Sequence, residues 1–229
     1  MPRVRRRSKE ETRALVLDAA LGLVRERVGG TGDDVVAAVL AHVRVTDVAS
    51  RAGVTTGAIY QLWPAQQDFR TDLVLHVARV QSDLRPGLDE SRAWFARARA
   101  DGVPFEDVVG ATAEQVRRLY LDDPLFRIEL ALPASAGDPR VQASMALRAQ
   151  VFLGQAEAAW AAMLETYGRR ARPPWTVRHL AVAAAAQLTG SVVLEWADPT
   201  LAEDPSGVPG WSLAARAVVT LVTGVTEPL

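Results

Sequence analysis

The chain has 229 residues and a mass of 24.7 kDa, and 49% of its residues are hydrophobic, so it can bury a substantial core. It contains no cysteine, which excludes disulfides, thiolate catalysis and cysteine-ligated metals. Residues 1–80 carry 12 basic and 9 acidic side chains, a balance of +3; the remainder carries 14 and 18, a balance of −4, which gives the net charge of −1. No apolar run approaches the roughly 20 residues that span a bilayer. No signal peptide is evident, so we expect a cytoplasmic protein.

The first predicted helix runs from about residue 8 to residue 27. Ser8 is a plausible N-cap, and Glu11 stands three residues later, which is the pattern of a capping box. The basic excess lies just before this helix, in a short arm that contains Arg5, Arg6 and Arg7. An acidic body with a basic arm suits a protein that presents one end to nucleic acid, although short basic tails are often only solvated termini.

The most informative stretch is residues 44–69, which has the pattern of a helix-turn-helix. Val45, Val48 and Ala49 repeat at helical spacing, Gly53 supplies a sharp turn, and a second short helix follows. That helix carries Ile59, Leu62 and Trp63 on its apolar side. Its other face offers hydrogen-bonding side chains and no negative charge: Thr55, Thr56, Tyr60 and Gln61. Such a helix fits the major groove of DNA. A plain helical hairpin is the alternative interpretation.

Residues 13–69 resemble the DNA-binding domain of the TetR family of bacterial transcriptional regulators. The matching residues form three groups: Leu17, Ala19, Ala20 and Leu21; Asp47, Val48, Ala49, Ala52, Gly53 and Val54; and Gly57, Ile59, Tyr60, Trp63 and Pro64. The resemblance implies an N-terminal DNA-binding domain, here residues 1–68, followed by a larger helical domain for ligand binding and dimerisation, here residues 69–229.

The sequence departs from the family pattern at three places. A segment near residues 33–43 reads as an additional helix, which either runs directly into the next helix or is a local elaboration packed on the first one; we favour the second. Arg44 stands where the family usually has a threonine cap, so the capping box is incomplete. Gln66 stands where the family often has a phosphate-binding lysine, which weakens or removes that contact.

We expect the DNA contacts to divide into two groups. Bases or phosphates are read by the second helix of the motif: Tyr60 resembles the family's phosphate-contacting tyrosine, Gln61 can pair with adenine, and Gly57 lets the backbone approach the duplex. Orientation comes from contacts with the DNA backbone. The complete predicted set is Arg5, Arg6, Arg7, Arg44, Thr46, Arg51, Thr55, Thr56, Gly57, Tyr60 and Gln61.

The rest of the chain reads as further helices with no strand-like alternation, so the predicted fold is all-α. The predicted helices cover residues 66–84, a segment around Trp94-Phe95 that stops near Gly102, and residues 105–121, 139–167, 176–196 and 210–225. A basic, proline-containing loop is expected at residues 169–174. One such helix-turn-helix covers little DNA, so we expect a homodimer on a palindromic operator.

The last two helices are the expected dimer interface. Residues 180–197 are rich in small side chains, and the final helix repeats Ala214, Ala215, Val218, Leu221, Val222 and Val225. Packing of these helices inside one subunit is the alternative.

The resemblance also implies an unknown, largely apolar small-molecule ligand in the larger domain. The candidate lining residues are aromatic or methionine side chains, with a few polar groups to orient the ligand. They are Trp94, Phe95, Phe126, Glu129, Gln155, Trp160, Met163, Tyr167 and Gln187. For each of them, core packing or plain surface exposure is the alternative.

The sequence contains no pattern of a catalytic, metal or cofactor site. The three histidines are scattered, and neither a phosphate-binding Gly-Lys-Ser/Thr loop nor a Gly-x-Ser-x-Gly elbow occurs. The sequence therefore predicts a TetR-like regulator, most simply a ligand-released repressor, rather than an enzyme. The alternative function is a helical small-molecule-binding protein or enzyme in which the helix-turn-helix is only structural.

Overall fold

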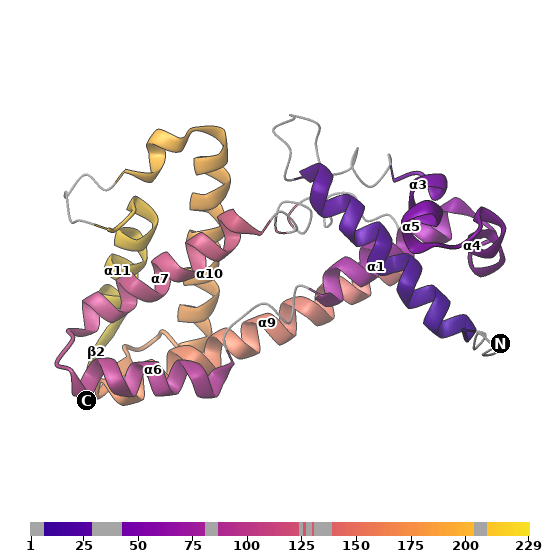
Figure 1. Cartoon of the computed structure of the whole chain (residues 1–229). Coiled ribbons are helices and arrows are strands. Elements are labelled where there is room, and N and C mark those ends of the chain that lie inside the picture. Colours follow the sequence, from indigo (N-terminus) through magenta and orange to yellow (C-terminus); the bar gives the residue numbers. More distant parts are fainter. Residues whose placement is uncertain are drawn as a thin grey trace. The chain divides into compact units, whose positions relative to one another are not determined.

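The computed structural model describes residues 7–28, 43–80, 87–123, 126, 130, 139–203 and 210–229. This part of the chain is helical apart from one small two-stranded sheet (Figure 1), so the all-α prediction is confirmed. In chain order the elements are α1 (Lys9–Val28), α3 (Val45–Ala52), α4 (Thr56–Leu62), α5 (Gln66–Val80), α6 (Leu88–Ala100), α7 (Phe105–Asp122), α9 (Pro139–Thr166), β1 (Arg169–Ala171), α10 (Val177–Ala197), the 3₁₀ turn η2 (Pro199–Ala202), α11 (Leu213–Val225) and β2 (Thr226–Pro228).

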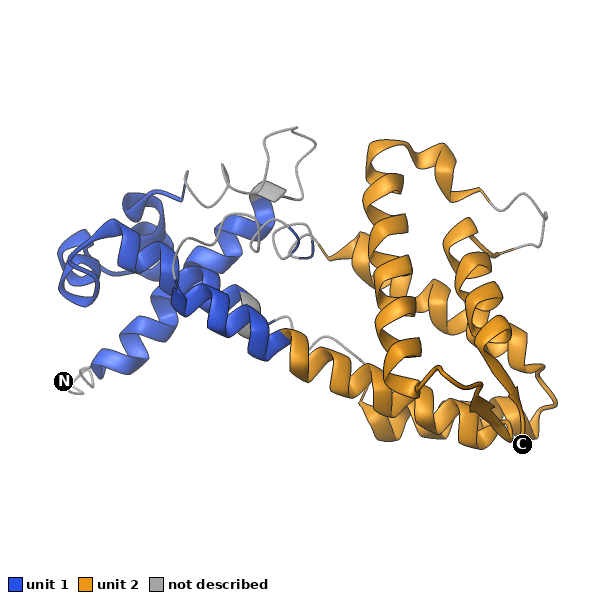
Figure 2. Cartoon of the chain, turned by 180° about the vertical axis from the view of Figure 1, so that it is seen from behind, with its two compact units in different colours: residues 1–84, 124–148 blue, residues 85–123, 149–229 orange. Residues whose placement is uncertain are grey.

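The chain divides into two compact units, coloured separately in Figure 2. Unit 1 comprises residues 1–84 and 124–148, and unit 2 comprises residues 85–123 and 149–229. The sequence analysis placed the boundary after residue 68. Unit 1 extends beyond that point because the apolar face of α5 is buried in the same core as α1, α3 and α4, through Phe69, Leu73 and Val77.

The first helix of unit 1 begins at the predicted capping box. The backbone N–H of Ser8 donates to Glu11 Oε2 at 2.7 Å, and the N–H of Glu11 donates to Ser8 Oγ at 3.0 Å. Two donors that a helix N-terminus leaves unsatisfied are thereby paired, which fixes the start of α1. The inward face of α1, including Ala20 and Val24, is fully buried in the core of unit 1.

The predicted additional helix near residues 33–43 lies outside the described residues, except for its last residue. Val43 is buried in the core, and neither Val43 nor Arg44 is helical. A helix that runs directly from the inserted segment into α3 is therefore excluded. Arg44 is the N-cap of α3, with extended backbone and no side-chain cap hydrogen bond, as the incomplete capping box predicted.

The core of unit 2 lies where α7 packs against α10 and α11. Its buried side chains come from the inward stripes of these three helices: Val108, Val109 and Ala113; Leu180, Ala184 and Leu188; Ala214, Ala215, Val218 and Val222. Four residues of the apolar repeat that was expected at the dimer interface therefore lie inside the subunit, whereas Leu221 and Val225 are half-buried. That part of the interface prediction was wrong, because periodicity does not distinguish an intramolecular from an intermolecular partner.

A cluster of charges connects the three core helices of unit 2. Arg117 of α7 donates to Glu114 Oε2 at 3.1 Å and to the two oxygens of Glu195 at 2.7 and 2.8 Å. The other oxygen of Glu114, a buried residue, accepts from the backbone N–H of Ser212, the N-cap of α11, at 2.5 Å. Burial works against the charge on Arg117, but its hydrogen bonds to Glu195 and Glu114 raise its pKa overall.

Close packing beside this cluster depends on the absence of a side chain at Gly110. A Cβ at this position would lie 2.4 Å from Cζ2 of Trp211, so only glycine lets the indole ring lie directly on α7. The guanidinium of Arg216 covers the ring from 4.5 Å. Trp211 thus holds the start of α11 against α7.

The sheet was not predicted. Strands β1 and β2 pair antiparallel, with Arg170 opposite Glu227, and connect the end of α9 with the end of α11. The prediction of a loop at residues 169–174 was therefore wrong for its first three residues. A three-residue strand gives almost no alternation to detect, and its partner here is 57 residues away in the sequence.

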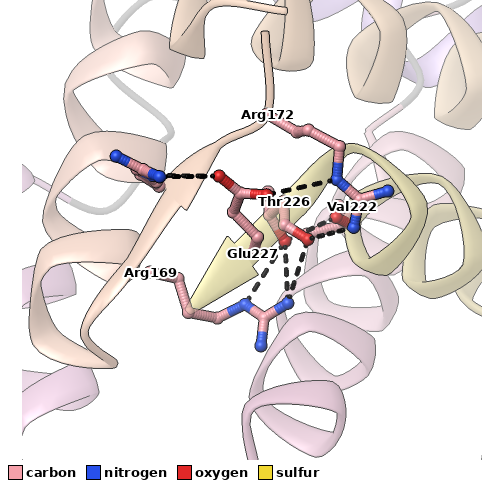
Figure 3. A network of polar contacts seen from close by, with 6 residues as sticks. Arg169, Arg172, Val222, Thr226 and Glu227 are labelled. Carbon is pink, nitrogen blue, oxygen red and sulfur yellow. Dashed lines mark hydrogen bonds and ion pairs between the residues drawn. The ribbon is translucent and has the colours of Figure 1, made fainter. Parts of the chain in front are cut away.

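Arginine side chains hold the β1–β2 sheet together (Figure 3). Arg169 donates from Nη2 to the carbonyl of Thr226 at 3.2 Å, Arg170 donates from Nε to Glu227 Oε1 at 3.0 Å, and Arg172 Nε lies 3.5 Å from Glu227 Oε2. The cations lie at the C-terminal end of α11, where they also complement the negative end of the helix dipole.

Among the described residues, α10 is long and apolar enough to cross a membrane by length and composition, and 28% of its most apolar window is buried. The core helix of a soluble protein meets the same criteria, so this finding alone does not indicate a membrane segment.

Candidate nucleic-acid interface

The turn between α3 and α4 has the geometry that the helix-turn-helix pattern predicts. Gly53 follows α3 with φ 64°, a left-handed conformation that glycine adopts without strain. Its N–H returns to the carbonyl of Ser50 at 3.3 Å. Thr55 then caps α4, because its hydroxyl oxygen accepts from the N–H of Ala58 at 3.1 Å.

The outer face of α4 carries four exposed residues: Thr56, Gly57, Tyr60 and Gln61. Tyr60 is 52% exposed although it is a large aromatic residue, and no residue of α4 is acidic. The opposite face is buried, with Ile59 and Trp63 at 1% and 3% exposure, as the sequence predicted. An isolated seven-residue helix would be marginal in water, so this packing is what maintains α4.

The C-terminal end of α4 is anchored by a polar and aromatic cluster. The indole N–H of Trp63 donates to Asp72 Oδ2 on α5, and Arg13 of α1 forms an ion pair with the same oxygen. The Arg13 guanidinium also lies 5.3 Å from the Trp63 ring centroid, and Phe69 packs edge-on against that ring at 5.3 Å. Contacts with two other helices therefore fix the orientation of the exposed face of α4.

The residues that were predicted to contact the DNA backbone differ in their surroundings. Arg44 and Thr46 are exposed at the start of α3, and Arg7 is exposed before α1, whereas Arg5 and Arg6 lie outside the described residues. Gln66 is exposed at the start of α5, without the cation that the family often has there. Arg51 is exposed as well, but it forms an ion pair.

The partner of Arg51 is Glu26 of α1. The distance from Arg51 Nη1 to Glu26 Oε2 is 2.7 Å. This hydrogen bond lowers the pKa of Glu26 and raises the pKa of Arg51, so both groups are charged at neutral pH. Neither this pair nor the Asp72 cluster was found by sequence reasoning. The only signals in the sequence were two acidic residues, Glu26 and Asp72, and the sequence does not indicate which cation each of them pairs with.

The predicted ligand-lining residues have different environments. Phe95, Met163 and Tyr167 are buried, Trp94 and Trp160 are half-buried, and Gln155 and Gln187 are exposed. Phe126 is buried but belongs to unit 1, and Glu129 lies outside the described residues. Two of them already have intramolecular partners, in that Tyr167 donates to the carbonyl of Val103 at 3.1 Å and Gln187 donates to Ser191 Oγ at 3.2 Å. The ligand set stays a prediction.

The outward faces of α10 and α11 are largely apolar in the monomer. On α10 the exposed apolar residues recur every three or four positions, which places them on one stripe: Val182, Ala186, Gly190, Val193, Leu194 and Ala197. Gln187 is exposed beside them, and Arg178 and His179 are exposed in the first turn. Leu194 is 58% exposed, and a Cβ at Gly190 would meet no atom within 4 Å. On α11 the corresponding exposed residues are Leu213, Thr220 and Gly224.

Comparisons with known proteins agree with this fold. No protein-family model and no curated protein matches the chain. Solved structures do match. NalD of Pseudomonas aeruginosa, the secondary repressor of a multidrug efflux pump, is 20% identical, with a TM-score of 0.52, and the match covers 97% of this chain and 100% of NalD. TylP, a TetR regulator from Streptomyces fradiae, is 17% identical, with a TM-score of 0.51 and coverage of 97% and 90%.

A third similar structure is the transcriptional regulator FadR from Bacillus subtilis in complex with stearoyl-CoA. It is 13% identical, with a TM-score of 0.51, and the match covers 93% of this chain and 98% of FadR. At these identities the likeness concerns the fold. The chain therefore has the fold of TetR-type regulators, and the resemblance noted in the sequence is confirmed at that level.

Proposed function

We propose that the chain is a DNA-binding transcriptional regulator that reads the major groove with α4. The exposed face of α4 carries the proposal: its side chains donate and accept hydrogen bonds, none is acidic, and the buried anchor at Trp63 fixes their orientation. The TetR-type fold supports the same assignment.

The residues of α4 have different roles in this proposal. Gln61 pairs with an adenine edge, an interaction that contributes about 1–3 kcal/mol of discrimination. Tyr60 donates its hydroxyl to a phosphate, and Gly57 allows the backbone to approach the duplex. Thr56 contacts a base edge or a phosphate. The Thr55 oxygen already accepts from Ala58, but its hydroxyl hydrogen is still available to a phosphate.

The remaining contacts orient the protein on the duplex without reading its sequence. Arg44 and Thr46 at the start of α3 touch the phosphate backbone, and the arm with Arg5, Arg6 and Arg7 adds further cations. These charges determine how steeply affinity falls with salt, because each phosphate neutralised releases counterions.

We further propose a homodimer through α10 and α11, on a palindromic operator. The exposed apolar stripe of α10, with Val193 at 45% and Leu194 at 58% exposure, supports this interface. A two-fold dimer places two copies of α4 on two half-sites, which compensates for the small area that one motif covers.

In this account the regulator is a repressor that a small, largely apolar molecule releases from its operator. Unit 2 is the proposed ligand-binding unit, because its helices carry aromatic and methionine side chains such as Trp94, Trp160 and Met163. A ligand that favours a mismatched separation of the two α4 helices weakens DNA binding; a hundredfold loss corresponds to about 2.7 kcal/mol of coupling.

The test is selection of duplexes from a random library with the purified full-length protein, followed by sequencing. Enrichment of a palindrome supports the proposal and identifies the operator. No enrichment, with only weak and salt-sensitive binding of all duplexes, contradicts it and favours the alternative, a helical small-molecule-binding protein or enzyme whose helix-turn-helix is structural.

A further inference from the structure

The side chain of Arg51 packs on α1 against two residues of that helix, Gly22 and Glu26, which we call the Arg51 seat. Glu26 accepts its hydrogen bond at 2.7 Å, and Gly22, one turn earlier on the same face, leaves room for the guanidinium. A Cβ at Gly22 would lie 3.0 Å from Arg51 Nη2 and 3.1 Å from both Cζ and Nε. Three atoms of the planar group thus lie equally close to the Gly22 position, so the guanidinium lies flat across the helix.

The position of Arg51 in the chain makes this seat important for α4. Arg51 is in the last turn of α3, two residues before the left-handed Gly53 and four before Thr55, which caps α4. The seat therefore holds the end of α3 on α1 just before the chain turns into the reading helix. At the other end of α4, the Trp63–Asp72 hydrogen bond has the corresponding role.

The charge of the seat argues against a phosphate contact by Arg51. The guanidinium and the Glu26 carboxylate neutralise each other, so the pair has no net charge with which to displace counterions from DNA. Glu26 takes one hydrogen bond from Nη1 of the guanidinium, and its carboxylate would repel a phosphate that approached the remaining donors.

We propose that Arg51 is a positioning residue, which with Gly22 and Glu26 fixes the turn between α3 and α4, and that it is not a phosphate ligand. This inference rests on the DNA-binding function proposed above and revises the role that the sequence suggested for Arg51. The geometry also requires arginine, since a lysine has no planar group to lie across Gly22.

The test measures binding of the selected operator duplex by full-length variants across a range of salt concentrations. Arg51→Gln and Arg51→Lys should each lower affinity about tenfold, as expected for a displaced reading helix, with an unchanged salt slope. The charge-swapped double variant Glu26→Arg/Arg51→Glu keeps a neutral pair and should bind more tightly than Arg51→Glu alone, which leaves two carboxylates together. It should still bind more weakly than the wild type, because no guanidinium of residue 51 then lies across Gly22.

Two comparators calibrate these results. Arg44→Gln removes a proposed phosphate ligand and should reduce the salt slope by about 0.9 per arginine lost. Arg92→Gln removes an exposed arginine of unit 2 that pairs with Asp89 and should change neither affinity nor slope. If Arg51→Gln fails to fold by circular dichroism, the charge-swapped variant carries the test.

The proposal is overturned if Arg51→Gln reduces the slope as Arg44→Gln does and the charge swap stays as weak as Arg51→Glu. It is also overturned if Arg51→Lys binds like the wild type. Hydrogen exchange without DNA separates this question from the proposed function: Arg51→Lys should accelerate exchange in the amides of residues 52–60. If wild-type protein selects no duplex, the function proposal fails, and the exchange result still decides whether the seat holds the turn.

Discussion

The exposed faces of α4 and α10 differ in chemistry although both belong to helices with one buried side. The face of α4 presents a phenol, an amide and a hydroxyl, whereas the face of α10 presents mainly valine, leucine, alanine and glycine, with Gln187 beside them. Water solvates the first face well and the second poorly. The contrast matches the two partners proposed above: a hydrated, hydrogen-bonding DNA groove for α4, and the apolar surface of a second copy for α10.

The ion pairs that hold α4 and α10 in place also differ in how deeply they are buried. Behind α4, Arg13 and Asp72 form an ion pair that is partly exposed, with a 44% exposed arginine side chain. Behind α10, Arg117 and Glu195 are each 15% exposed, and Glu114 is buried. Loss of one partner should therefore cost more in unit 2, because a buried charge without a partner is strongly destabilising.

The largest expected effect is on stability, through the buried cluster of Arg117, Glu114 and Glu195. Arg117→Met leaves the carboxylates of Glu114 and Glu195 without their cation, and we expect a loss of about 3 kcal/mol in the free energy of unfolding. Urea unfolding followed by circular dichroism measures the loss. Arg178→Met, which removes an exposed ion pair to Glu157, is the control and should cost less than about 1 kcal/mol. Equal losses would show that burial of the Arg117 cluster does not make it more important for stability than an exposed ion pair.

The next effect concerns the apolar face. Leu194→Lys places a charge in the proposed interface twice per dimer, and the dimer dissociation constant should rise about a hundredfold or more. Analytical ultracentrifugation measures it. Leu147→Lys is the matched control, because this α9 leucine is 63% exposed and lies outside the proposed interface. An unchanged association state in Leu194→Lys would remove α10 from the interface.

Gln61→Ala tests base reading by the polar face. We expect discrimination at one base-pair position in each half-site to fall by about 1–3 kcal/mol, while other positions keep their preference. Repeating the duplex selection with the variant gives the position-by-position comparison. If the base preferences match those of the wild type, Gln61 does not read sequence.

Tyr60→Phe should have the smallest effect. Removal of one hydrogen bond from the neutral phenol to a charged phosphate weakens binding by about 1.5 kcal/mol per half-site, the low end for a charged acceptor because the site is exposed, and to a similar extent on all duplexes. The salt slope should stay constant because no charge is lost. Titrations on the operator and on an unrelated duplex test both points, and an effect confined to the operator would refute the phosphate role.

Local patterns predicted much of the fold. The capping box at Ser8 and Glu11, the turn at Gly53, and the helix extents depend on residues a few positions apart, and all of these are present in the structure. The exposed positions of α4 followed from the same periodicity, because Ile59 and Trp63 determine which side is buried.

Contacts between distant residues could not be predicted in this way. Arg51 and Glu26 are 25 positions apart, and Arg13 and Asp72 are 59 apart, so no local spacing connects them. The sequence analysis named α10 as an interface helix but could not tell which of its sides stays exposed. A helix rich in alanine on all sides has no single apolar face, and only its neighbours decide which residues stay exposed.

The most direct test of the account compares binding of the selected palindrome with binding of the same duplex after one half-site is scrambled, at two salt concentrations. The account predicts a loss of at least about tenfold on scrambling, and a steep fall in affinity with salt for the intact palindrome. Equal affinity for both duplexes would show that two copies of α4 do not read two half-sites, and would contradict the proposal of a dimeric, sequence-reading regulator.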